Sequence, residues 1–151
     1  MNKKYVIVDI DGTLSKVGER VRYLQQSPPD WDSFYDDCFE DEPFEDVCEL
    51  VSRLNRCDAY ELIFCTGRRE SCREKTEKWL YRYLEERVPR EKLLMRADGD
   101  IRPDIVVKPE LVAEAGIKPE EIAFVLEDRN CVVEMWRKMG VRCLQVAEGD
   151  F

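Results

Sequence analysis

The sequence predicts an α/β protein with a five-stranded parallel sheet flanked by helices. Short apolar runs rich in β-branched residues alternate with longer segments whose apolar residues recur at helical spacing. Strands that alternate with helices in this way form a parallel sheet covered on both faces. Polar residues directly follow several of the runs, and such sheets bind ligands at the carboxyl ends of their strands. The strands are expected over residues 5–10, 60–65, 93–95, 122–126 and 141–146.

The helices and one insert complete the expected organisation. Four helices are expected: one beginning at Pro43, one over 69–86, one beginning at Pro109, and one over 130–139. Residues 104–108 are expected to be a short apolar segment that precedes the third helix. Residues 15–42 are polar and interrupted by two prolines, so they are interpreted as a small cap-like insert rather than a second domain. The chain 1–151 is therefore expected to be a single domain.

The composition excludes several classes of function. The chain has no histidine, which removes the usual general base and every Ser-His-Asp arrangement. Its seven cysteines are odd in number and contain no CxxC spacing, which favours reduced thiols in a cytoplasmic protein over zinc or disulfides. No apolar run approaches the length of a membrane span. The net charge of −9 disfavours broad, charge-driven association with nucleic acid, although a local pocket for one strand end remains compatible with it.

The most informative motif is the sequence Asp9-Ile-Asp11-Gly12-Thr13, which follows the first apolar run. It places two carboxylates two residues apart where a strand gives way to a loop, and Gly12 lets the backbone turn closely around a bound group. Two acids this close repel, so one of them tends to keep its proton at neutral pH. Such a pair suits a nucleophile beside a general acid. Solvated aspartates capping a strand are the alternative.

Three further signals are weak singly and strong together. Thr66-Gly67-Arg68 follows the second run, where an ordinary exit turn is the alternative, and Lys108 precedes a proline, where a surface lysine is the alternative. Glu127-Asp128 follows the fourth run and offers the oxygen ligands that magnesium prefers, although Asp128 could also cap a helix. All of these residues are expected at the carboxyl edge of one sheet, so they are expected to converge with Asp9.

These motifs, in this order, resemble those of the haloacid dehalogenase (HAD) superfamily, which implies a HAD-type Rossmann-like fold. A closer resemblance is to the 3′-phosphatase domains of phage polynucleotide kinases, carried by residues 9–16, 104–108, 133–137 and 145–151. The family pattern has two aspartates where this chain has Glu127-Asp128, which makes the role of the first acid less defined. The kinase half is not expected, because no glycine precedes a lysine and the phosphate-binding GxxxxGK[ST] loop is therefore missing.

The resemblance implies a role for each motif residue. Asp9 would attack phosphorus, Asp11 would protonate the departing oxygen, Thr66 would hydrogen-bond the phosphoryl oxygens, and Lys108 would offset their charge. Mg²⁺ would be held by Asp9, the backbone carbonyl of Asp11, Asp128 and Glu127. The residues implied to contact the phosphate and the substrate strand are Thr13, Arg20, Gly67 and Arg68. Asp104 would support Lys108.

The function implied by the resemblance is a magnesium-dependent polynucleotide 3′-phosphatase of nucleic-acid end repair, working with a separate kinase or ligase. Two alternatives stay open. One is a HAD phosphatase of free nucleotides or small phosphometabolites, and the other is a HAD-fold binding protein without turnover. The sequence does not distinguish DNA from RNA ends, does not decide whether a 2′,3′-cyclic phosphate is accepted, and does not define the oligomeric state.

Overall fold

The computed structural model describes residues 2–150 and contains one five-stranded sheet in which every neighbouring pair is parallel. The strand order is β3-β2-β1-β4-β5. The strands are β1 (Lys4–Val8), β2 (Tyr60–Arg69), β3 (Leu93–Arg96), β4 (Ile122–Glu127) and β5 (Cys143–Gln145). The prediction of a five-stranded parallel sheet is therefore confirmed.

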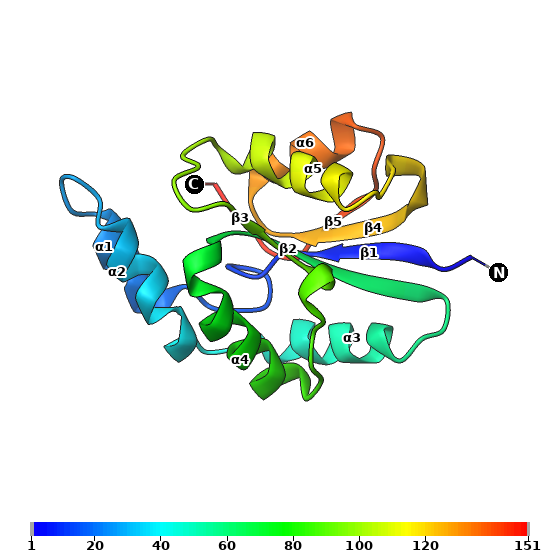
Figure 1. Ribbon diagram of the computed structural model, residues 1–151, viewed down its shortest axis with the longest axis horizontal. Coiled ribbons are helices and arrows are strands. Elements are labelled where there is room, and N and C mark those ends of the chain that lie inside the picture. Colours follow the sequence, from blue (N-terminus) through cyan, green and yellow to red (C-terminus); the bar gives the residue numbers. More distant parts are fainter. Residues whose placement is uncertain (1, 151) are drawn as a thin grey trace.

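Two hydrophobic cores lie on opposite faces of this sheet, as the alternation along β1 requires. Val6 and Val8 point into one core, and Ile7 points into the other. Helices α3 (Glu45–Asn55) and α4 (Arg73–Leu84) cover the first face. Helices α5 (Asp104–Glu114) and α6 (Asn130–Lys138) cover the second, so the sheet is the middle of three layers (Figure 1). Among residues 2–150, no helix combines the length and the apolar character needed to cross a membrane.

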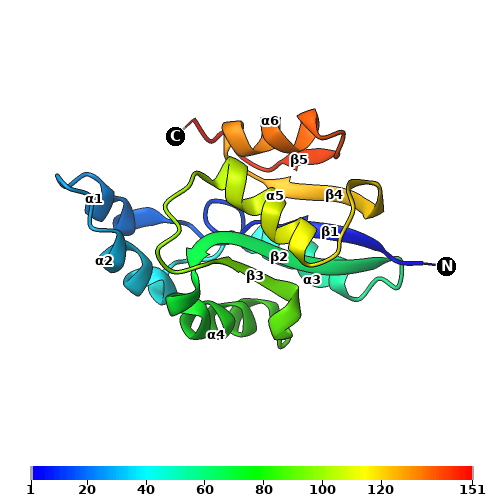
Figure 2. The same ribbon diagram turned by 45° about the horizontal axis from the view of Figure 1, so that its top comes forward.

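The insert between β1 and α3 forms two short helices with 3-10 turns on either side. These are α1 (Val21–Leu24) and α2 (Trp31–Asp36), and the turns cover Gly18–Arg20 and Asp37–Glu40. Asp30 caps α2 by accepting a hydrogen bond from the Ser33 amide. In both views α1 and α2 project beyond the carboxyl ends of the strands (Figures 1 and 2). We call residues 15–42 the cap.

The expectation for residues 104–108 was wrong, because they are the first turns of α5 rather than a segment before it. The carbonyl oxygen of Pro103 accepts hydrogen bonds from the amides of Val106 and Val107, so the helix begins at Asp104. Pro109 lies inside the helix rather than at its start. Lys108 consequently lies on a helix that packs on β2 and β3, and not at the end of a strand.

The second expectation that the structure corrects concerns Thr66-Gly67-Arg68, which is not an exit turn. The strand β2 continues through these residues to Arg69. Thr66 pairs with Met95, and after an irregularity in register Arg69 pairs with Arg96. Gly67 and Arg68 lie within this irregularity, and the side chain of Arg68 is buried.

Candidate active site

Asp9 lies immediately after β1 and is buried. Its backbone amide donates to the carbonyl of Leu126 at 3.0 Å, which holds it between β1 and β4. One carboxylate oxygen accepts a hydrogen bond from Lys108 Nζ at 2.8 Å and the other accepts one from Thr13 Oγ1 at 2.9 Å. Burial raises the pKa of Asp9 to about 7, the charge of Glu127 adds to the rise, and Lys108 opposes it. The nucleophile proposed from the sequence is thus fixed in place by two donors.

The turn after Asp9 depends on Gly12. Its φ of +84° favours glycine, and its amide donates to the carbonyl of Ser15 at 2.8 Å. A Cβ atom on this residue would overlap the carboxylate of Asp128. The close approach of Gly12 to Asp128 therefore brings the first and last motifs together.

Replacing Gly12 by alanine is expected to reduce phosphatase activity about a hundredfold or more, because Asp128 must move away. The matched control is Gly99→Ala, since Gly99 has a φ of +82° but its added Cβ would meet nothing within 4 Å. Both variants carry a similar backbone strain, on the order of 1–3 kcal/mol. Thermal unfolding and phosphate release from an aryl phosphate separate the two effects. Equal losses of activity in the two variants would contradict the role assigned to the contact with Asp128.

Lys108 occupies the centre of a buried charge cluster. Its ammonium group lies 2.8 Å from Asp9 and 2.7 Å from Glu127. Burial alone would lower the pKa of Lys108, but the charges of Asp9 and Glu127 outweigh it and raise this pKa well above its usual value. Lys108 therefore stays cationic, with its charge directed at the position where Asp9 would meet a phosphate.

Asp9, Glu127 and Asp128 form a group whose carboxylate oxygens lie within 4.8 Å of one another. Such oxygens fit a magnesium ion, which prefers hard ligands. Glu127 is already engaged, because one of its oxygens bonds Lys108 and the other accepts the Asp128 amide at 3.1 Å. Asp128 accepts a side-chain hydrogen bond from Thr13 at 3.2 Å. Burial, followed by the charge of Asp9, raises the pKa of Asp128 to about 6. A bound cation would offset the negative charge that these neighbouring acids share.

Asp11 is held by the two arginines that the family resemblance assigns to the substrate. Its carboxylate accepts hydrogen bonds at 2.7 Å from both Arg20 and Arg68, and one at 3.1 Å from Ser15. Burial would raise the pKa of Asp11, but the charges and hydrogen bonds of Arg68, followed by Arg20, outweigh it and hold this pKa below its ordinary range. Of the two aspartates in the motif, Asp9 therefore retains a proton more readily than Asp11.

Arg20 and Arg68, which the resemblance assigns to the phosphate and the substrate strand, are buried and both face Asp11. Arg20 also bonds Asp41 at 2.5 Å and donates to the carbonyl of Phe34 at 2.7 Å, so it ties the cap together. Because the side chain of Asp11 is 22% exposed, the two guanidinium groups meet at a carboxylate that solvent reaches.

Thr66, Gly67 and Asp104 lie beside this cluster. Thr66 is buried, and its Oγ1 accepts the Arg68 amide at 3.2 Å. A Cβ on Gly67 would overlap the carboxylate of Asp104. Asp104 accepts a hydrogen bond from Arg96, and its charge is one of those that raise the pKa of Lys108. Its support of Lys108 is thus electrostatic, through space, and its hydrogen bond fixes the start of α5 against β3.

The sequence reasoning missed two supports of the site. Asp41 is buried against Arg20, and nothing in the local pattern of the cap distinguishes it from the neighbouring exposed acids. The second support is the C-terminal tail, which packs behind the Glu127-Asp128 motif. The carbonyl of Gly149 accepts the Asn130 amide at 2.7 Å, and the Gln145 side chain donates to the carbonyl of Asp128 at 2.9 Å. The tail residues were noted only for their family resemblance.

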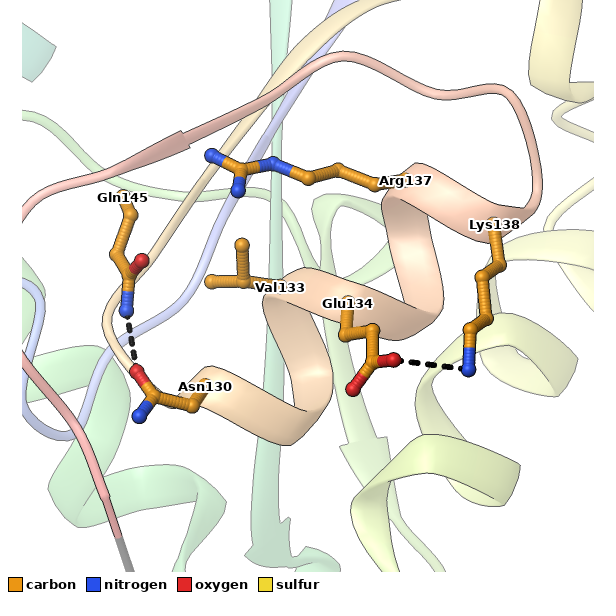
Figure 3. Close-up of a pocket in the computed structure, with 6 residues that line it drawn as sticks. All are labelled: Asn130, Val133, Glu134, Arg137, Lys138 and Gln145. Atoms are coloured by element: carbon orange, nitrogen blue, oxygen red, sulfur yellow. Dashed lines mark hydrogen bonds and ion pairs between the residues drawn. The ribbon is translucent and has the colours of Figure 1, made fainter.

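A surface hollow of about 370 Å³ lies along α6 and the edge strand β5 (Figure 3). Its charged and amide groups are paired within the chain, with Glu134 bonded to Lys138 at 2.9 Å and Gln145 bonded to Asn130 at 2.7 Å. The hollow lacks the acids and the lysine of the cluster around Asp9. The lining residues are Asn130, Val133, Glu134, Arg137, Lys138 and Gln145.

Comparison with known proteins decides the family. Residues 3–151 match the family model described as the polynucleotide kinase PNKP phosphatase domain. The chain belongs to this family. The HAD resemblance of the four motifs is thereby confirmed, together with the narrower resemblance to polynucleotide kinase phosphatase domains.

Individual relatives agree with the family assignment. A chain in the structure of the Pnkp1/Rnl/Hen1 complex is 32% identical, with a TM-score of 0.81 over 100% of this chain and 48% of that one. The "Putative bifunctional polynucleotide kinase/RNA ligase" of Autographa californica nuclear polyhedrosis virus is 29% identical over 90% of this chain and 18% of its own length. The chain therefore spans less than half of each of these relatives.

A more distant structure shows the fold alone. The haloacid dehalogenase-like hydrolase SP0104 from Streptococcus pneumoniae is 13% identical, with a TM-score of 0.63 over 95% of this chain and 84% of that one. The five-stranded parallel sheet described above is accordingly a HAD-type fold. The match to the family model, and not this likeness, identifies the chain as a phosphatase domain.

Proposed function

We propose that the chain is a magnesium-dependent polynucleotide 3′-phosphatase that prepares nucleic-acid ends for repair. The observation that carries the proposal is the buried Asp9 carboxylate, held between Lys108 and Thr13 and adjoining Asp128, in a chain of the polynucleotide kinase phosphatase family. This arrangement gives the family's chemistry a nucleophile, a fixed positive charge and a set of oxygen ligands.

The reaction follows from the groups around Asp9. An oxygen of the Asp9 carboxylate attacks phosphorus, the bond from phosphorus to the 3′ oxygen breaks, and Asp11 supplies the proton that the departing oxygen needs. Water then attacks the aspartyl-phosphate, Asp11 takes back a proton, and inorganic phosphate leaves. Lys108 offsets negative charge on Asp9 and the phosphoryl group throughout. Mg²⁺ would be held by Asp9, Asp128 and the backbone carbonyl of Asp11, and it would neutralise charge on the phosphate and orient the phosphate. Glu127 would hold Lys108 beside these ligands.

Asp11 can act as an acid only if the hold of its two arginines weakens. A substrate phosphate bound beside Asp9 adds negative charge near Asp11, which offsets part of the positive charge of Arg20 and Arg68. The pKa of Asp11 then rises, so that Asp11 can carry a proton. The two arginines, whose side chains are buried, would thus control the protonation of the general acid from within the protein.

The substrate is tested by phosphate release from a matched panel. An oligonucleotide with a 3′-phosphate is expected to be hydrolysed at least about tenfold faster than the same oligonucleotide with a 5′-phosphate. DNA and RNA versions, a 2′,3′-cyclic phosphate, nucleoside monophosphates and an aryl phosphate complete the panel. Equal rates on 3′ and 5′ ends would overturn the end-repair proposal while leaving the phosphatase assignment in place.

A second candidate is a phosphatase of free nucleotides or small phosphometabolites. The net charge of −9 favours it, because an acidic surface repels the backbone of a long polyanion. A nucleoside monophosphate or sugar phosphate hydrolysed faster than every oligonucleotide of the panel would select this function.

The names of the relatives further suggest that, under the end-repair proposal, a kinase and a ligase act on the same ends, in other domains or partner proteins.

A further inference from the structure

An aromatic side chain stands exposed on the cap. Trp31, the first residue of α2, is 44% exposed, whereas Trp79 and Trp136 are almost completely buried. The Trp31 ring stacks on Tyr35, with centroids 6.1 Å apart and ring planes inclined by 25°, and it meets Phe34 edge to face at 5.8 Å. Phe34, and not Trp31, is the buried aromatic residue of α2. The exposed face of Trp31 is therefore not needed to pack the interior of the cap.

The two stacked rings are held in place by contacts of Tyr35 with β2, the strand that carries Thr66. The hydroxyl of Tyr35 donates to the carbonyl of Gly67 at 3.3 Å, in the part of β2 that also carries Thr66. The guanidinium group of Arg69 lies 5.3 Å from the centroid of the Tyr35 ring, and Asp32 holds Arg69 at 2.8 Å. Tyr35 therefore connects the strand beside Asp9 to Trp31, whose ring is the exposed end of a continuous stack.

The charge of the cap limits what this surface can bind. Residues 15–42 contain eight acidic and three basic side chains, so the cap repels the phosphates of a nucleic-acid backbone. A nucleobase is uncharged and has two aromatic faces, and bases stack on exposed tryptophan rings with little dependence on their sequence. The surface of the cap can therefore bind a base, whereas its negative charge disfavours contact with additional phosphates.

We propose that Trp31 is a stacking platform for the nucleobase of the terminal nucleotide whose 3′-phosphate is placed against Asp9. This rests on the proposed function, and it assigns to the cap the recognition of a single, unpaired terminal base. Affinity for the end would then come from one stacked base and one phosphate, so it would depend weakly on base identity and on salt concentration.

The kinetic test compares two otherwise identical oligonucleotide 3′-phosphates, one with a base on its terminal nucleotide and one abasic there. The native chain is expected to prefer the base-bearing end about tenfold or more in kcat/KM. Trp31→Ala is expected to remove this preference by slowing only the base-bearing substrate, and Trp31→Phe is expected to keep most of it. The control Tyr81→Ala alters another exposed aromatic residue, on α4, and is expected to change neither rate.

A binding test removes turnover from the question. In an Asp9→Asn background, adding the base-bearing oligonucleotide is expected to quench tryptophan fluorescence, because Trp31 is the one exposed tryptophan of the three. The abasic oligonucleotide is expected to quench it far less, and a further Trp31→Phe change is expected to abolish the response.

Two outcomes are kept apart by this design. If Trp31→Ala hydrolyses both ends as fast as the native chain, or slows both equally, the stacking platform is overturned while the 3′-phosphatase function stands. If the native chain hydrolyses a small phosphate monoester but neither oligonucleotide end, the proposed function itself fails and the platform fails with it.

Discussion

Asp9→Asn is expected to lower kcat by about four orders of magnitude or more, with the fold preserved. An amide oxygen is too weak a nucleophile to attack phosphorus, and losses of this size follow the removal of a covalent nucleophile. The fold should survive because Lys108 keeps Glu127 as an ionic partner at 2.7 Å. Phosphate release is measured on an aryl phosphate and an oligonucleotide 3′-phosphate, and the circular dichroism spectrum reports the fold.

Asp11→Asn is the matched comparison, since it makes the same chemical change two residues away. Its effect is expected to be small on an aryl phosphate, whose leaving group needs little protonation, and large on the oligonucleotide, whose 3′ oxygen needs a proton. An Asp9→Asn variant with substantial activity, or an Asp11→Asn variant that loses equally on both substrates, would contradict the assigned roles.

Removal of divalent metal is expected to abolish activity, and excess Mg²⁺ is expected to restore it. The two neighbouring acids should respond differently to isosteric replacement. Asp128→Asn removes a carboxylate from the proposed metal ligands, so the Mg²⁺ concentration for half-maximal activity should rise tenfold or more. Glu127→Gln removes the charge that pairs with Lys108, so its main effect should be a lower kcat and a lower melting temperature.

The measurement is a Mg²⁺ titration of activity for the native chain and both variants, with melting curves alongside. Undiminished activity in the presence of a strong chelator would remove the metal from the proposed reaction. A larger shift in Mg²⁺ requirement for Glu127→Gln than for Asp128→Asn would reverse the roles of the two acids.

The sheet and the location of the site could be predicted because their signals are local. The apolar run that leads to Asp9 and the glycine of the turn are close together in the sequence, and the two acids at the end of β4 are adjacent. The parallel topology then brings them to one edge. Lys108 differs from these residues, because it reaches Asp9 from a helix and not from the end of a strand.

The helical start of α5 was missed because Ile105, Val106 and Val107 are β-branched and Pro109 follows them. Burial shows the helical pattern instead: Val107 and Lys108 are buried, while Ile105 and Val106 are more than one-third exposed. Tertiary packing against β2 and β3 decides this segment, and no local preference reveals it.

The pairing of Arg20 and Arg68 with Asp11 could not be read from the sequence for a different reason. These partners are separated by 9 and 57 positions, and Asp41, which completes the cluster, lies 21 positions from Arg20. Family resemblance identified the arginines but indicated contacts with substrate. Only the folded cap shows that a carboxylate of the protein occupies them in this structure.

The tail behind the Glu127-Asp128 motif has a practical consequence for how the protein is prepared. Gly149 packs on the backbone of Asp128 and Arg129 so closely that a Cβ atom would overlap it. An affinity tag or fluorescent fusion inserted beside Gly149 would act on the segment that positions Asp128, and it could depress activity without touching a catalytic group. The start of β1 lies at the opposite end of the sheet (Figure 1). An N-terminal tag is therefore the appropriate choice for assays in which a few-fold change in rate has to be interpreted.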